Sequence, residues 1–118
     1  MPQTRKPIDR GLFQETLSET IKNRLDDPFL GVQDLCTAVH LSRAQLHRRL
    51  KAQTGLSATL FIRSVRLERA KEMLMGTDLP ISQVAFDVGF HDQAFFSRVF
   101  SREFGLTPVL YRRKGKPS

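Results

Sequence analysis

The chain has 118 residues, of which 40% are hydrophobic and nine are phenylalanine. This length and composition suffice for one domain with a hydrophobic core, or for two small lobes, and argue against disorder except at the ends. The formal net charge is +7, from 19 Lys and Arg against 12 Asp and Glu. Such an excess favours a polyanionic partner, which could be DNA, RNA or an anionic membrane surface.

Several classes of protein are disfavoured by what the sequence lacks. No stretch approaches the roughly 18 apolar residues of a membrane span, and the N-terminus is polar rather than signal-like. A single cysteine, Cys36, cannot form an internal disulfide and fits a packing position in a cytoplasmic protein. The three histidines and the acids show no metal-site spacing, and there is no glycine-rich phosphate loop. We therefore expect no catalysis, no metal and no cofactor.

The predicted elements begin with one amphipathic helix. Phe13, Leu17, Ile21 and Leu25 recur every four residues, which is the apolar stripe of a helix. Asp-Asp-Pro at 26–28 is expected to end this helix.

The middle and the end of the chain repeat one pattern. Residues 32–41 align with residues 81–90 at an offset of 49, and the offset becomes 50 after the turn, where Ser42 matches Asp92. Each copy predicts a short helix, a tight turn and a longer helix, which is typical of a helix-turn-helix. His40 takes the turn position of Gly89, although glycine suits a left-handed turn best.

A long helix is expected between the two copies. Ser57 is a suitable N-cap, the helix runs to about Met75, and its apolar residues cover more than one face. It therefore predicts a connector with a core on each side. Pro80 suits the first turn of the next helix, and Thr107-Pro108 opens a last short helix to about Arg113. The predicted fold is all-α, with two helix-turn-helix subdomains, a connector helix and seven helices in a homeodomain-like arrangement.

The domain boundaries follow from these elements. We predict a flexible tail or linker stub at 1–11, a folded domain at 12–113 and a basic tail at 114–118. Within the domain we expect the first helix-turn-helix at about 32–54, the connector at about 58–75 and the second helix-turn-helix at about 81–104.

The longer helix of each unit is the candidate recognition helix, whose exposed side chains contact base edges in the major groove. With the apolar residues inward, the candidate base-contacting residues are Arg43, Ala44, His47, Arg48, Gln93, Ala94, Ser97 and Arg98. Arg binds guanine bidentately, Gln binds adenine, and Ala packs against a thymine methyl group. The candidate phosphate-contacting residues are Lys51, Ser82, Arg102, Arg112, Arg113 and Lys114.

Each of these basic residues has a simpler alternative, which is to solvate a helix surface. Arg48 and Arg98 favour DNA contact because they occupy matching positions of the two repeats. Arg49 is expected to pack or lie on the surface. Three connector arginines could approach a phosphate, but salt bridges to glutamates on the same helix are the safer expectation; these are Arg63, Arg66 and Arg69. Of the adjacent Phe95 and Phe96, one is expected in the core and the other against the connector.

These residues resemble a known family. Ile81-Ser-Gln-Val-Ala-Phe-Asp-Val-Gly-Phe90, Phe96-Ser-Arg-Val-Phe100 and Phe104-Gly-Leu-Thr-Pro108 are similar to the signature of the tandem helix-turn-helix DNA-binding domain of AraC/XylS-type transcriptional regulators. The resemblance covers about residues 13–113. The sequence departs from the family pattern at His40 and Arg49, and Ala44 and Ala94 are short where longer side chains often stand.

The resemblance implies sequence-specific double-stranded DNA binding by two recognition helices in successive major grooves, at an asymmetric promoter site, and regulation of bacterial transcription by contact with RNA polymerase. It also implies a cytoplasmic, nucleoid-associated protein. We expect the output domain of a larger regulator, whose effector, dimerisation or receiver domain lies elsewhere in the parent protein. The alternatives are a small stand-alone activator of the same family and a non-specific nucleic-acid packaging protein.

Overall fold

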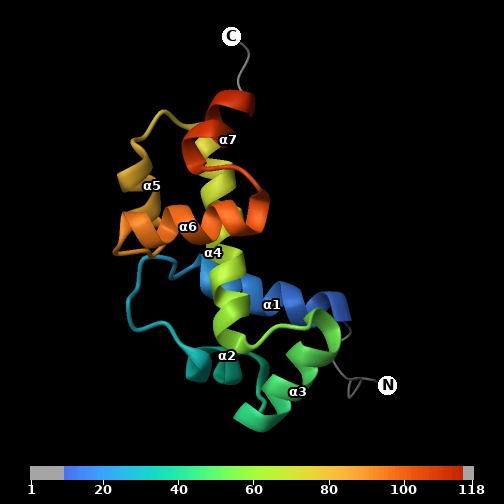
Figure 1. Ribbon diagram of the computed structural model, residues 1–118. Coiled ribbons are helices and arrows are strands. Elements are labelled where there is room, and N and C mark those ends of the chain that lie inside the picture. Colours follow the sequence, from blue (N-terminus) through green and yellow to red (C-terminus); the bar gives the residue numbers. More distant parts are fainter. Residues whose placement is uncertain (1–9, 116–118) are drawn as a thin grey trace.

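The computed structural model describes residues 10–115, and the regular structure in this range is entirely helical (Figure 1). The helices are α1 (Arg10–Lys22), α2 (Val32–Val39), α3 (Arg43–Thr54), α4 (Ala58–Gly76), α5 (Ile81–Asp87), α6 (Gln93–Phe104) and α7 (Pro108–Gly115). The predicted all-α fold with seven helices is confirmed for these residues.

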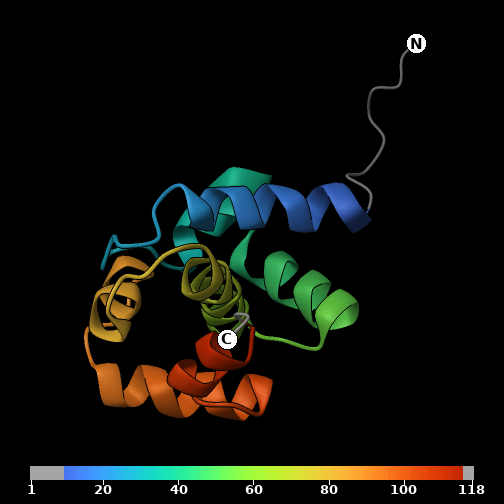
Figure 2. The same cartoon turned by 90° about the horizontal axis from the view of Figure 1, so that it is seen from above.

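The connector helix α4 lies in the middle of the molecule and separates two hydrophobic cores. Figure 2 shows α4 nearly end-on, with α1 and α6 on opposite sides of it. Phe61 and Val65 of α4 belong to a core shared with α1, α2 and α3, which we call the first lobe. Ala70 and Leu74 belong to a core shared with α5 and α6, which we call the second lobe. The two-sided apolar pattern of α4 thus reflects two separate cores.

The two recognition helices have matching caps. The Ser42 hydroxyl accepts a hydrogen bond from the backbone N–H of Gln45, while the Gln45 side chain accepts one from the Ser42 N–H. The Asp92 carboxylate accepts from the N–H groups of Ala94 and Phe95. These bonds satisfy donors that a helix start leaves unpaired. The helices end at Gly55 and Gly105, both in the left-handed conformation.

The first helix is shorter than its apolar stripe predicts, because α1 ends at Lys22 and Leu25 lies beyond it. Arg24 turns away and donates to Asp27 at 2.6 Å and to Asp34 at 2.7 Å, which ties the following loop to the start of α2. Leu25 still packs inward and contacts both cores. Periodicity identified a partly buried residue here but not the loop that carries it.

Three other boundaries differ from the predictions. Arg10 and Gly11 are helical, since α1 begins at Arg10, and the fully buried Phe13 lies in its first turn. Pro80 is the N-cap of α5 rather than a residue of its first turn. The helix α7 continues to Gly115, past the predicted end of the domain. The rest of the predicted tails, residues 1–9 and 116–118, lies outside the described range.

Candidate nucleic-acid interface

The outer face of α3 carries the four residues predicted to contact bases. Leu46 and Leu50 are fully buried and fix the register of this helix. The residues Arg43, Ala44, His47 and Arg48 are all exposed on the opposite side. A helix held in this way presents its first two turns to solvent, as a recognition helix must.

The helix α6 has the same arrangement with different side chains. Phe96 and Phe100 are fully buried, in register with Leu46 and Leu50 of α3. Gln93, Ala94 and Arg98 are exposed, and Ser97 is half-buried. The face that α6 presents therefore has fewer charges than that of α3.

Phe95 joins the connector to the second recognition helix. Two guanidinium groups lie near its ring, with the Cζ of Arg63 at 5.8 Å and that of Arg98 at 5.7 Å from the centroid. These are cation–π distances. The predicted division of roles is confirmed, since Phe96 is in the core and Phe95 faces α4, with its ring also 6.1 Å from that of Phe90.

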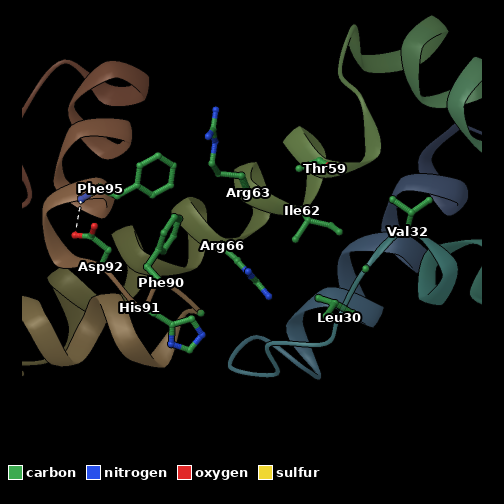
Figure 3. A pocket seen from close by; sticks show the side chains of 12 residues that line it. Leu30, Val32, Thr59, Ile62, Arg63, Arg66, Phe90, His91, Asp92 and Phe95 are labelled. Carbon is green, nitrogen blue, oxygen red and sulfur yellow. Dashed lines mark hydrogen bonds between the residues drawn. The ribbon is translucent and has the colours of Figure 1, made fainter.

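The start of α4 connects the faces of the two recognition helices. Thr59 lines one hollow with Arg43 and His47 of α3, and a second, of about 470 Å³, with Arg63 and Phe95 (Figure 3). Arg63 forms no ion pair within the described residues, so the expected salt bridge is not observed. We call the group Arg43, His47, Thr59, Arg63, Phe95 and Arg98 the connecting surface.

The predicted phosphate contacts fall into two groups. Ser82, Arg102, Arg113 and Lys114 are exposed. Lys51 is exposed too, although its Nζ donates to the carbonyl of Gly55 at 3.2 Å. Arg112 differs, because its Nε donates to the carbonyl of Leu74 at 3.0 Å and its Nη2 is buried. The guanidinium of Arg112 therefore caps the end of α4.

The remaining arginines partly match the sequence expectation. Arg49 lies over the ring of Phe13, with Cζ 4.7 Å from the centroid, which confirms a packing role. Arg69 pairs with Glu72 at 2.8 Å. Arg66 has no carboxylate partner within the described range, and its burial lowers its pKa. The sequence did not reveal the observed contacts of Arg63 and Arg66, because glutamates on the same helix offered partners at suitable spacing. The expectation that Phe95 or Phe96 lies against the connector was the one signal for the contact of Arg63.

Residues 10–115 contain neither a metal-site grouping nor a membrane-spanning helix. No group of three His, Cys, Asp or Glu side chains is placed to hold a metal ion. No helix in this range is long and apolar enough to cross a membrane.

Two capped recognition helices on either side of one connector define a tandem helix-turn-helix domain. A family model described as a helix-turn-helix domain matches residues 35–114. The HTH-type transcriptional regulator MtrA of Neisseria gonorrhoeae is 32% identical over 108 residues, which are 90% of this chain and 36% of MtrA. The chain belongs to the AraC-type family of helix-turn-helix transcriptional regulators. It spans about a third of the length of the curated relatives it matches.

Solved structures agree with this assignment. A transcriptional regulator of Chromobacterium violaceum with an AraC-type DNA-binding domain superposes with a TM-score of 0.81 at 26% identity, covering 90% of this chain and 95% of that one. The DNA-binding domain of AdpA, solved in complex with a target DNA, gives a TM-score of 0.68 at 25% identity, covering 84% and 91%. DNA-binding transcription regulation is accordingly the function of this class of domain.

Proposed function

We propose that the domain binds an asymmetric promoter site with α3 and α6 in successive major grooves on one side of the DNA. The observation that carries this proposal is that both helices are capped, exposed and mounted on one connector, while their exposed residues differ. Two unlike recognition helices on one chain do not favour a palindrome. The two halves of the site should lie about one helical turn apart.

In this proposal α3 makes the stronger electrostatic contact. It presents Arg43, His47, Arg48 and Lys51, whereas Arg98 is the single full charge on the comparable face of α6. We assign base contacts to the exposed residues of both helices, namely Arg43, Ala44, His47, Arg48, Gln93, Ala94, Ser97 and Arg98. We assign phosphate contacts to Lys51, Ser82 and Arg102. We add Arg63, because it forms no ion pair within the described residues and its guanidinium lies near the Phe95 ring, as that of Arg98 does.

For the whole protein we propose an output domain of a larger bacterial regulator that activates transcription through RNA polymerase. The support is that MtrA is nearly three times as long as the matched region. Another domain of the parent would then provide effector binding, dimerisation or phosphorylation control. We propose that the protein acts in the cytoplasm, on the nucleoid. Transcription reconstituted with purified RNA polymerase tests the activator role.

Selection of bound fragments from random DNA tests the binding proposal. The enriched fragment and a scrambled fragment of equal composition are then compared at one fixed salt concentration, because both kinds of binding release counterions. We expect at least about a thousandfold preference for the enriched fragment. Equal affinity for the two fragments would instead identify a non-specific packaging protein.

A further inference from the structure

The turn between α5 and α6 is in direct contact with the first lobe. A Cβ built on Gly89 would overlap the carbonyl oxygen of Leu25 and would lie only 2.7 Å from Cζ of Arg66. The same atom built on Gly55 or Gly105 meets nothing within 4 Å. Gly89 is therefore needed for close approach as well as for its left-handed φ of 99°.

Arg66 lies between the two lobes, in the wall of the hollow of about 470 Å³ described above. Figure 3 shows its side chain leaving α4 and passing between Phe90 of the second lobe and Leu30 of the first. Its Nη2 is 3.5 Å from the carbonyl oxygen of Asp27, and its Nε is buried without a hydrogen-bond partner in the described structure. Burial lowers the pKa of Arg66, whereas the charge of Asp27 raises it. The Arg66 side chain is therefore in a position to hold the two lobes at a fixed separation.

The contact limits how the lobes can move. The two lobes share α4, and Leu25, which follows α1, packs against both cores. A rotation of the second lobe about α4 would drive the Gly89 backbone into Leu25 and Arg66, or would leave the partly buried guanidinium of Arg66 without its present packing. Packed contacts of this kind favour one arrangement over a continuous range.

We propose that the Arg66–Gly89 contact fixes the distance and rotation between α3 and α6 and thereby selects the spacing between the two halves of the DNA site. This inference rests on the proposed function. Each base pair inserted between the halves separates them by about 3.4 Å and rotates them by about 35°. A rigid pair of recognition helices cannot follow that change, whereas a loosened pair can. Arg66 is thus a positioning residue for DNA recognition.

The first test compares Gly89→Ala with Gly105→Ala. Both positions have positive φ, at 99° and 80°, so both variants carry similar backbone strain, but only Gly89→Ala creates a clash. Binding is measured on the enriched site and on copies with one base pair added or removed between the halves. We expect the wild type and Gly105→Ala to lose at least about tenfold in affinity on the altered spacings. Gly89→Ala should lose less than about threefold, from a weaker starting affinity.

Arg66→Ala provides a second variant that introduces no clash. It should also reduce the spacing preference below about threefold, and Arg66→Lys should restore part of it. If Gly89→Ala does not fold, by circular dichroism, Arg66→Ala decides the matter. Retention of the full spacing preference by a folded Arg66→Ala protein would overturn the inference. Absence of any preferred site in the wild type would instead contradict the proposed function.

A distance measurement without DNA separates the two proposals further. Nitroxide labels at Ala52→Cys on α3 and Glu103→Cys on α6 occupy exposed positions outside the predicted contacts. The background carries Cys36→Ala, since alanine is the residue at the equivalent position of the second unit. We expect one narrow distance distribution for the wild type and for Gly105→Ala, and a broadened or displaced one for Arg66→Ala. Identical distributions for all three would show that the contact does not orient the lobes.

Discussion

His40 and Gly89 occupy the same turn position in the two helix-turn-helix units, yet His40 is exposed, whereas the backbone of Gly89 lies against Leu25 and Arg66. Both residues have left-handed backbones, with φ of 56° and 99°. The backbone N–H of each residue bonds back to the preceding short helix, but a Cβ on Gly89 would clash with the Arg66 side chain. The first turn can therefore carry a side chain at the cost of backbone strain, and the second cannot.

Replacement of His40 by glycine should stabilise the protein. A non-glycine residue in the left-handed region costs about 1–2 kcal/mol, and glycine gives back part of this gain through the entropy of the unfolded chain. We expect the free energy of unfolding to rise by up to about 1 kcal/mol, measured by urea denaturation. His91→Gly is the matched control, because His91 is exposed without a positive φ and should gain nothing. An equal gain in both variants would refute the strain argument.

The loop after α1 should make the fold sensitive to acid. The backbone N–H of Phe29 and the guanidinium of Arg24 lower the pKa of Asp27, and the N–H of Gly31 and the same guanidinium lower that of Asp34. A carboxyl with a lower pKa in the folded chain stabilises the fold above its unfolded pKa. That stabilisation disappears as the pH falls through the folded pKa. The urea concentration at the unfolding midpoint should therefore decrease as the pH falls below about 4.

A pair of variants isolates this contribution. Asp34→Asn removes one of the two carboxylates, so it should lower the urea midpoint at pH 7. It should also make the decrease of that midpoint below pH 4 smaller than in the wild type. Asp26→Asn, at an exposed acid in the same loop, should leave the pH profile of the wild type in place. The carboxylates of Asp27 and Asp34 are both partly accessible to solvent, so the effect of their ion pairs on stability should shrink in high salt. Superimposable profiles for the wild type and Asp34→Asn would exclude the mechanism.

The sequence predicted the elements of each lobe well and their junction poorly. Caps and apolar periodicity are local signals, so Ser42, Asp92 and the buried face of α6 were identified correctly. Leu25 was placed in a helix because its spacing matched, whereas one ion pair of the loop after α1 joins Arg24 to Asp34, ten positions away. The role of Arg66 depends on three segments meeting in space. No pattern along one helix distinguishes that arrangement from a surface salt bridge.

Arg48 and Lys51 should affect DNA binding in different ways. An arginine bound bidentately to guanine discriminates one base pair, so Arg48→Ala should cost about 1–3 kcal/mol on the enriched site and relax selectivity at one position. A lysine on phosphate contributes to every sequence, so Lys51→Ala should weaken enriched and scrambled DNA alike. It should also reduce the salt slope by about 1. A uniform loss of affinity in Arg48→Ala would show that Arg48 contacts phosphate.

Phe95 should support DNA binding without contacting a base. Phe95→Leu keeps an apolar side chain but removes the ring on which Arg63 and Arg98 lie. Both contacts are present in the unbound protein, so their loss acts through the placement of Arg63 and Arg98. At about 0.5–1 kcal/mol for each contact, the dissociation constant should rise by no more than roughly thirtyfold. Phe86→Leu is the control, since Phe86 is 55% exposed and its recorded ring contact is with His91. Equal effects of the two substitutions would argue against the connecting surface.

Arg112 should matter for stability more than for DNA binding, in contrast to its exposed neighbour Arg113. The Nε of Arg112 donates to the Leu74 carbonyl near the end of α4, where a positive charge also favours the helix dipole. Arg112→Ala leaves that carbonyl without its partner and should lower the free energy of unfolding by about 1–2 kcal/mol. Arg113→Ala should change it by less than about 0.5 kcal/mol. If Arg112→Ala lost DNA affinity at unchanged stability, that result would support the phosphate contact predicted for Arg112 from the sequence.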